Sequence, residues 1–419
     1  MTTSDKRVTS PVNPVEGKVR TRGGRFEFLD ALRGVAALAV VIEHCSVQVS
    51  PAYERFSITY FGAGVFGVFV FFITSGFIIP ASLERGRSLG AFWVGRFFRL
   101  YPLFWICLIV ALILHAVRAY GGPPGFLADP AANILTNFSM AHFFLVGGYS
   151  QMLVVAWTLS YELVFYMIVS LLFVAGLNRR SVPLAVLAIG SIPLAELFLP
   201  SSMIGGSDAT LTTRLTVAIV TVLVAVCVAQ RAATKGSAVA AVVLASIAIP
   251  LLLNQPGPSG YSATIFATMF VGTVLYRMTA DEISAALGWA VFVLAGGVIV
   301  GLELLRHPVP WNNKACTLGA AYLLFAVALL LRRRSFPRPL LFLGRISYSL
   351  YLVHALAINF LPKWPVSVIG IPAALLTWIT WVLGSIAIAA LTYHKIEKPA
   401  LALGHRLIGK MAERTRAAA

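Results

Sequence analysis

The chain has 419 residues, of which 58% are hydrophobic and only 12% are charged, against about 25% charged residues in soluble domains. Apolar runs of about 20 residues recur along the sequence, which is typical of membrane-spanning helices and excludes an ordinary soluble domain. The formal net charge of +17 does not indicate nucleic-acid binding, because the basic residues lie in short loops between the apolar runs. The composition therefore predicts an all-α, polytopic membrane protein.

The chain divides into two short tails and one membrane domain. Residues 1–27 are polar and basic, and they are predicted to form a disordered cytoplasmic tail without the apolar region of a secretory signal peptide. Residues 28–399 are predicted to form the transmembrane domain, and residues 400–419 a short basic cytoplasmic tail. We expect about twelve spans, or ten to twelve if a weak run is interfacial. The apolar runs lie near 29–49, 61–80, 100–119, 152–176, 182–199, 212–230, 237–253, 262–277, 285–304, 315–331, 346–361 and 371–391.

Lysine and arginine residues between the runs set the predicted orientation. With a cytoplasmic N-terminus, only six of the 33 basic residues fall in outer loops, which fits the positive-inside rule and places both termini in the cytoplasm. The outer segment 120–151 is half-apolar, and we expect it to cap a cavity as a re-entrant or interfacial segment. The four cysteines lie within apolar runs without metal-like spacing, so neither a disulfide framework nor a metal site is predicted.

The first apolar run carries two ionisable residues on one face. Arg33 and His44 are eleven residues apart, close to a whole number of helical turns, with a rise of about 16 Å between them. Ionisable side chains inside a bilayer usually face a cavity or a partner. Each residue also has a purely structural interpretation. Arg33 is then an anchor whose side chain snorkels to the membrane surface, and His44 is a hydrogen-bonded histidine within a packed core.

Two further segments contain candidates for ligand binding. Ser75 lies among glycines in the run 61–80, where small residues favour close helix packing but also expose backbone to a ligand. Arg96 and Arg99 lie three residues apart on one helical face, at the inner end of the next run. They serve either as membrane anchors or as a phosphate clamp, since the arginine fork fits phosphate oxygens.

A carboxylate in the run 152–176 needs a partner inside the membrane. Glu162 must be paired or protonated there, and a histidine is a natural partner. A Glu–His pair in a dry site fixes the tautomer of the imidazole and raises its basicity, as a general base for a hydroxyl requires. Glu162 and Glu43 are both candidate partners of His44, and the sequence does not choose between them.

The run 346–361 begins with a polar stripe. Ser347, Tyr351 and His354 fall at i, i+4 and i+7, so they share one face of an apolar helix. Such a stripe either holds helices together or lines a cavity. The side chains predicted to line the site are, in chain order, Glu43, Ser75, Trp157, Tyr161, Ser347, Tyr348, Tyr351 and His354.

Five segments, in this order, resemble the integral-membrane acyltransferase-3 family: FLDALRGVAALAVVIEH, FFITSGF, RFFRLYP, WTLSYE and LGRISYSLYLVH. The family's Arg-X10-His element falls on Arg33 and His44, and its W-x-L-x-x-E element ends at Glu162. Its basic pair falls on Arg96 and Arg99. The resemblance implies that His44 is the essential histidine with Glu162 as its support, and that the three arginines bind acyl-CoA.

The resemblance also implies a reaction. Members of the family transfer an acyl group, most often acetyl, from cytoplasmic acyl-CoA to a hydroxyl of a cell-surface polysaccharide or a lipid-linked sugar. The expected location is the bacterial inner membrane, with acyl-CoA, a glycan acceptor and membrane lipids as partners and no tightly bound cofactor. Many members have about ten spans, so the segment 182–331 matches the family poorly. Two alternatives stay open: acylation of a small molecule such as an antibiotic, and a flippase or transporter for a lipid-linked sugar.

Overall fold

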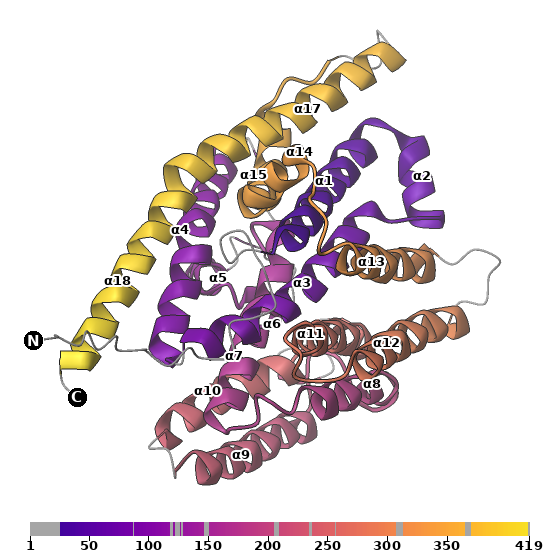
Figure 1. Ribbon diagram of the computed structural model, residues 1–419. Helices are drawn as coiled ribbons and strands as arrows, with labels where there is room; N and C mark the ends of the chain where they lie inside the picture. Colours follow the sequence, from indigo (N-terminus) through magenta and orange to yellow (C-terminus); the bar gives the residue numbers. More distant parts are fainter. Residues whose placement is uncertain are drawn as a thin grey trace, which may run out of the picture.

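The computed structural model describes residues 26–417 except 87, 118–119, 122–125, 127–128, 146–150, 205–208, 234–236, 256, 307–312 and 365–369. Residues 1–25 of the predicted N-terminal tail and parts of the predicted outer segment 120–151 lie outside the described residues. Every regular element of the described chain is a helix, as Figure 1 shows. The predicted all-α fold is confirmed.

Each predicted apolar run coincides with one helix. Eight helices of the described chain are long and apolar enough to cross a membrane, or nine if the bent pair α14–α15 forms one span. The polytopic membrane fold is therefore confirmed, and the number twelve stays a prediction. The matching helices are α1 (Glu27–Val49), α3 (Ala63–Gly86), α4 (Leu89–Ala116), α7 (Trp157–Val174), α8 (Ser181–Phe198), α9 (Leu211–Ala233), α10 (Ala238–Leu253), α11 (Ser259–Thr279), α12 (Ala285–Arg306), α13 (Asn313–Leu330), α15 (Ser347–Phe360) and α17 (Ile371–Thr392). The shorter and additional elements are α2 (Pro51–Thr59), α5 (Pro130–Ser139), α6 (His142–Leu145), η2 (Val154–Ala156), α14 (Arg338–Arg345), the π-helical turn η3 (Tyr393–Glu397) and α18 (Lys398–Ala417).

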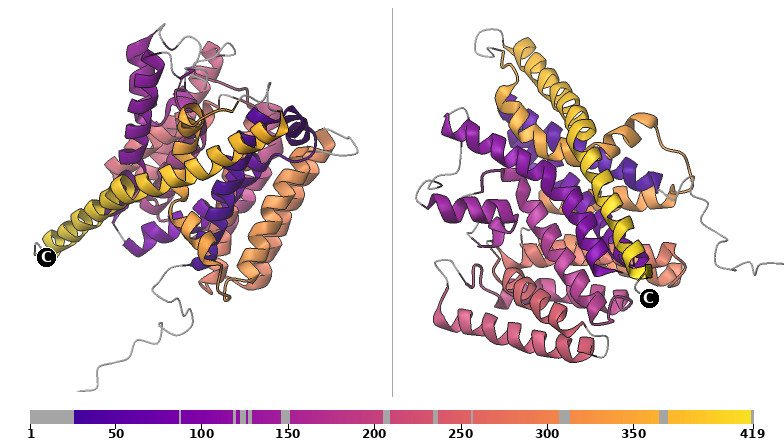
Figure 2. Two further views of the ribbon diagram at one scale, coloured as in Figure 1. Left: turned by 90° about the horizontal axis from the view of Figure 1, so that it is seen from above. Right: turned by 90° about the vertical axis from the view of Figure 1, so that its left-hand side faces the viewer.

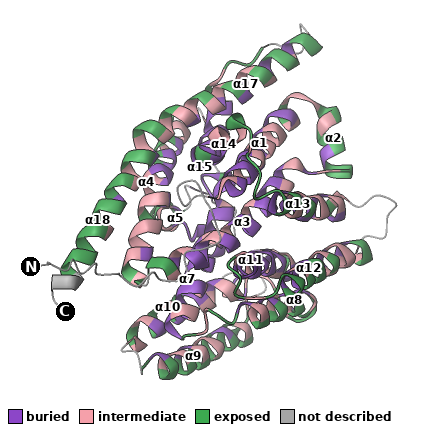
Figure 3. Cartoon of the chain, viewed as in Figure 1, coloured by how far each residue is buried: buried purple, intermediate pink, exposed green. Residues whose placement is uncertain are grey.

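Helix α11 is too polar to belong to these eight helices, and it lies inside the bundle. It packs against α3, α8 and α12, and 16 of its 21 residues are buried. Its threonines find partners there: the Thr268 hydroxyl lies 3.0 Å from that of Tyr322, and Thr273 donates to the Gly76 carbonyl at 3.0 Å. Helix α9 shows the opposite pattern, since only three of its residues are buried and its surface is largely exposed in Figure 3. Its exposed apolar side chains are those expected of a helix that faces lipid.

Helices α1, α3 and α11 approach one another closely at glycines. A Cβ added at Gly67 of α3 would lie 2.4 Å from the Ala36 carbonyl oxygen of α1. A Cβ at Gly272 of α11 would lie 2.3 Å from the Ile73 carbonyl oxygen of α3. Small residues of this kind let membrane helices pack backbone to backbone. The close packing holds α3 beside α1, and both helices line the cavities described below.

Substituting Gly76 with alanine is expected to destabilise the protein. A Cβ at this position would lie 1.8 Å from the Met269 carbonyl oxygen, so α3 and α11 must move apart. Overpacking costs about 1–3 kcal/mol, and the melting temperature of the detergent-solubilised protein should fall. The matched control is Gly297→Ala on α12, where an added Cβ meets no atom within 4 Å. Equal melting temperatures for the two variants would contradict the close approach of α3 and α11.

The chain ends in one long helical rod. Helix α17 continues through the turn η3 into α18, which crosses beside α4 in both views of Figure 2. The stretch 400–419, predicted only as a short basic tail, is thus helical to residue 417. The physical reason is a recurrence of apolar residues at helical spacing: the Ile408 side chain lies over Gly95 of α4, and Met411 lies over Gly90.

Candidate functional site

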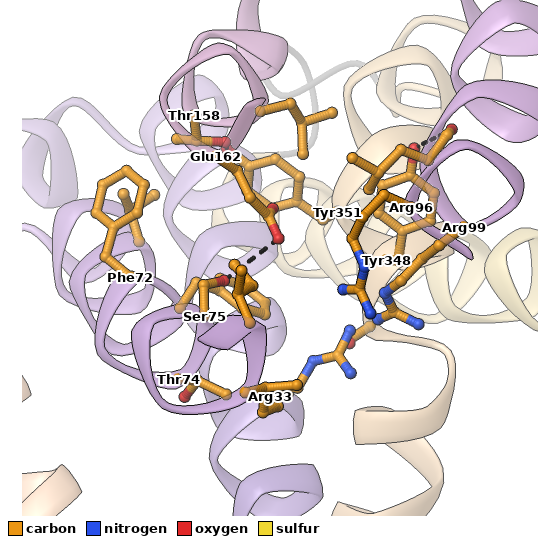
Figure 4. Close-up of a pocket in the computed structure, with 17 residues that line it drawn as sticks. Arg33, Phe72, Thr74, Ser75, Arg96, Arg99, Thr158, Glu162, Tyr348 and Tyr351 are labelled. Carbon is orange, nitrogen blue, oxygen red and sulfur yellow. Dashed lines mark hydrogen bonds between the residues drawn. The ribbon is translucent and has the colours of Figure 1, made fainter. Parts of the chain in front are cut away.

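Three cavities with shared walls follow α1 through the bundle. The central cavity, of about 200 Å³, lies between α1, α3, α4, α7 and α15 and is drawn in Figure 4. A basic cavity of about 390 Å³ shares Arg33, Arg96 and Arg99 with it, and we call these three residues the arginine cluster. A histidine cavity of about 510 Å³ shares Val68 and Tyr351 with the central cavity. The three cavities therefore form one series from the arginine cluster to the histidine cavity.

The arginine cluster gathers three guanidinium groups from two helices, and Figure 4 shows them converging. Arg33 comes from α1, whereas Arg96 and Arg99 come from α4. Arg96 donates to the Ser82 hydroxyl at 3.1 Å and lies over the Phe92 ring, 5.4 Å from its centre. Within the described chain the arginine ion pairs are made by other arginines, and none involves this cluster. Two carboxylates, Glu162 and Glu397, line the same cavities, so the three guanidinium groups outnumber the carboxylates around them. Such an excess of positive charge suits a phosphate, whose oxygens fit the arginine fork.

The C-terminal rod supplies one wall of the basic cavity. Tyr393 and Glu397 of η3 and His405 of α18 line it, together with Arg345 of α14. Glu397 accepts a hydrogen bond from the Ser349 hydroxyl of α15 at 2.7 Å. Single π-helical turns are frequent at functional sites. None of these four residues was predicted to line the site, because they lie in segments interpreted as a span terminus, a loop or a tail.

Glu162 lies in the central cavity and not beside His44. Its carboxylate accepts from the Tyr166 hydroxyl at 2.6 Å and from the Ser75 hydroxyl at 3.4 Å, and the second bond is drawn in Figure 4. In the described chain no hydrogen bond joins Glu162 to His44. The expected Glu–His pair is therefore absent. The physical reason is that two neighbouring hydroxyls satisfy the Glu162 carboxylate within its own part of the bundle.

His44 is paired with a second histidine. Its Nδ1 lies 2.7 Å from Nε2 of His354 on α15, and the two rings are nearly parallel, with 19° between their planes. His44 lines the histidine cavity, whereas the His354 side chain is completely buried. His354 is the last residue of the polar stripe predicted on α15, and this residue is the one that contacts His44.

Glu43, the other candidate partner of His44, holds helix α2 instead. Its carboxylate accepts from the Tyr53 hydroxyl at 2.9 Å, from the Ser57 hydroxyl, and from the Ala63 backbone N–H at 3.2 Å. Burial and the neighbouring carboxylate raise the pKa of Tyr53 above its usual range, so this hydroxyl stays protonated and keeps donating. Glu43 also lines the histidine cavity, where it fixes the α2 segment at the edge.

The other predicted site residues divide between the cavities and the core. Ser347 and Tyr348 line the central cavity, and Trp157 lines the histidine cavity. Tyr351 lines both, and its hydroxyl lies 2.8 Å from that of Thr158. Tyr161, predicted to line the site, belongs to the core instead. Its hydroxyl is 2.5 Å from that of Ser262 and its ring packs among other aromatic rings.

Val68 is the site residue that a sequence signal could have identified. It precedes Ser75 by seven residues, so the two side chains share one face of α3. Residues on that face line the central cavity, and Val68 also reaches the histidine cavity. An apolar residue in an apolar helix carries no chemical signal of its own, and only its spacing from Ser75 marks it.

Comparison with known proteins identifies the family to which the sequence is similar. The model of the acyltransferase-3 family, described as an acyltransferase domain, matches residues 26–394. The chain is 24% identical over 365 residues to nodulation protein 10 of Rhizobium leguminosarum bv. viciae, covering 82% of this chain and 84% of the relative. It is 28% identical over 149 residues to acyltransferase MdmB of Streptomyces mycarofaciens, covering 34% of this chain and 38% of that protein. No solved structure matches the chain significantly.

Proposed function

Because the chain belongs to the acyltransferase-3 family, we propose that this multi-pass membrane acyltransferase moves an acyl group from cytoplasmic acyl-CoA to a hydroxyl of a cell-surface polysaccharide or lipid-linked sugar. The proposed location is the bacterial inner membrane, with both termini in the cytoplasm. Acetyl is the proposed acyl group. The observation that carries the proposal is the series of cavities with shared walls between the arginine cluster and the histidine cavity.

Acyl-CoA matches this series from end to end. Its phosphates are the anions that the arginine cluster is suited to bind. The pantetheine arm is narrow and carries amides, and the central cavity offers it the polar side chains of Ser75 and Glu162. The rise along α1 from Arg33 to His44 is about 16 Å, the order of length that such an arm must cross. The thioester would then reach the histidine cavity.

The histidine cavity is proposed to hold the reaction itself. It is the largest of the three, and most of its lining is apolar, including Val40 and Val47 of α1. Several of its lining residues, among them Ile58 and Val154, are exposed, so the cavity opens to the surface of the bundle and gives the acceptor a way in. His44 would remove the proton of the acceptor hydroxyl as that hydroxyl attacks the thioester carbonyl. The acceptor enters from the side of the bundle opposite to the arginine cluster.

Binding of CoA tests the donor directly. CoA should raise the melting temperature of the detergent-solubilised protein in a concentration-dependent manner. Substituting Arg99 with glutamine should weaken CoA binding about tenfold or more, because a hydrogen bond to a charged group contributes about 1.5–3 kcal/mol. The control is Arg333→Gln, an exposed residue outside the three cavities. A flippase for a lipid-linked sugar would show no stabilisation by CoA, and that result would contradict the proposed donor.

Acyl transfer itself is measured on the product. Mass spectrometry of surface glycans from the producing cell, with and without this protein, should differ by one acyl mass. Purified protein should release free CoA from acetyl-CoA when that glycan or its lipid-linked precursor is added. If the glycans are unchanged and the protein acylates an added small molecule, the acceptor is a small molecule and the proposed glycan acceptor is wrong.

A further inference from the structure

We propose that His354 is a positioning residue, which fixes the tautomer of His44 so that Nε2 of His44 accepts the proton. The inference rests on the proposed acyl transfer, and it replaces Glu162 as the support of the essential histidine. It depends on a chain of two hydrogen bonds that begins at the backbone of α15 and ends in the histidine cavity.

The first bond sets the tautomer of His354. Its Nδ1 lies 3.0 Å from the carbonyl oxygen of Leu350, one turn earlier on α15. A carbonyl oxygen only accepts hydrogen bonds, so Nδ1 of His354 must carry a hydrogen. The His354 side chain is completely buried, and in the described chain no carboxylate is bonded to it. An ionised group without a partner is costly in such a place, so His354 is neutral and its Nε2 holds a lone pair.

The second hydrogen bond sets the tautomer of His44. Nε2 of His354 lies 2.7 Å from Nδ1 of His44, and because the first nitrogen is an acceptor, the second must donate. A neutral imidazole carries one hydrogen, so Nε2 of His44 is left with a lone pair. Among the described residues this nitrogen has no hydrogen-bond partner, and the side chain lines the histidine cavity. The backbone of α15 therefore dictates which nitrogen of His44 is basic.

Other polar groups around the pair do not take over this role. Glu43 is engaged with its three donors around α2. The ring of Tyr351 lies 6.1 Å from that of His354, and its hydroxyl is bonded to Thr158 and to the Val155 carbonyl. Glu54, from α2, also lines the histidine cavity and has an exposed side chain. The neighbouring carboxylates thus lie at the rim of the cavity or are already bonded.

The tautomer matters for each step of the reaction. The acceptor oxygen forms a bond to the thioester carbonyl carbon while its proton passes to Nε2 of His44. The carbon–sulfur bond then breaks, and the sulfur of CoA takes that proton from Nε2. The products are the ester and free CoA, and His44 returns to its starting form. With the hydrogen on Nε2 instead, His44 has no lone pair facing the cavity and neither step proceeds.

Two substitutions of His354 with different hydrogen-bonding ability test the proposal. In His354→Leu the acceptor is lost, and kcat should fall about 100- to 1,000-fold, within the range that general-base catalysis contributes. In His354→Gln the amide oxygen still accepts from Nδ1 of His44, and kcat should stay within about tenfold of the natural enzyme. KM for acetyl-CoA and stabilisation by CoA should be unchanged in both variants, because the arginine cluster is distant from the pair.

The alternatives give different results. Equal kcat values for the leucine variant and the natural enzyme would overturn the proposal. If kcat falls equally in both variants, His354 has only a packing role and the proposal also fails. If the leucine variant does not fold, nitrogen-15 NMR of histidine-labelled natural protein decides, since the proposal requires hydrogens on Nδ1 of both rings. A natural enzyme without acyl-CoA-dependent transfer would instead contradict the proposed function, so the two failures are distinguishable.

Discussion

Substituting His44 with glutamine is expected to lower kcat for acyl transfer by about 100- to 10,000-fold, the contribution of a positioned general base. Glutamine has nearly the shape of histidine and retains a hydrogen bond to His354, but it cannot take a proton. The affinity for CoA should remain unchanged, because the arginine cluster lies about 16 Å away along α1. Product formation under saturating acetyl-CoA measures the first quantity, and thermal stabilisation by CoA measures the second.

A matched control separates this effect from general disturbance. His115→Gln makes the same substitution on α4, in a side chain that bonds a backbone carbonyl and lies outside the three cavities. It should retain most of the activity. If the His44→Gln variant hydrolyses acyl-CoA and transfers its acyl group as fast as the natural enzyme, His44 has no part in the reaction.

Substituting Val68 with tryptophan is expected to stop transfer while the donor still binds. Val68 and Tyr351 are the two residues common to the central and the histidine cavity, and Val68 is 5% exposed. A large ring at this position closes the route of the pantetheine arm, and transfer should fall more than about 100-fold, comparable to the loss of a base. CoA should still stabilise the variant, since the arginine cluster is unchanged.

A reversible block shows that the loss is not caused by misfolding. Overpacking by tryptophan costs about 1–3 kcal/mol, which lowers stability as well. In Val68→Cys, a bulky methanethiosulfonate reagent should inhibit transfer, and a reductant should restore it. Val68→Ala is the control that leaves the route open. Full activity of the tryptophan variant with intact CoA binding would show that the thioester reaches His44 by another path.

The sequence predicted the positions of the helices well, and it placed Arg33 and His44 on one face of α1, because both features carry strong signals. Long apolar runs mark helices whatever they pack against. Arg33 and His44 stand out because charged and polar groups are rare in such runs, and their spacing alone places them on one face of α1. The same holds for Arg96 and Arg99, which the structure joins to Arg33.

Pairing between distant helices was beyond the sequence. Glu162 and Glu43 were the two candidate partners of His44, whereas His354, 310 positions away in the sequence, was predicted only as part of a polar stripe on its own helix. Which side chain meets His44 depends on how α7 and α15 rotate against α1. The structure gives the bond to His354 and gives Glu162 two hydroxyl partners instead. Helix α18 was not predicted for a related reason. Its apolar face is short and interrupted by basic residues, and the face is recognised only once α4 is known to pack against it.

The series of cavities also has an electrical consequence. A polar route through a membrane that holds a voltage invites ion leakage, and each charge that crosses 100 mV gains about 2.3 kcal/mol. Hydrophobic constrictions close such routes by excluding water, and fixed positive charge repels protons and metal cations. Val68 is an apolar side chain that borders both the central and the histidine cavity, and the arginine cluster lines the central cavity as well. The residues proposed to line the passage of acyl-CoA would therefore also limit ion leakage across the membrane between turnovers.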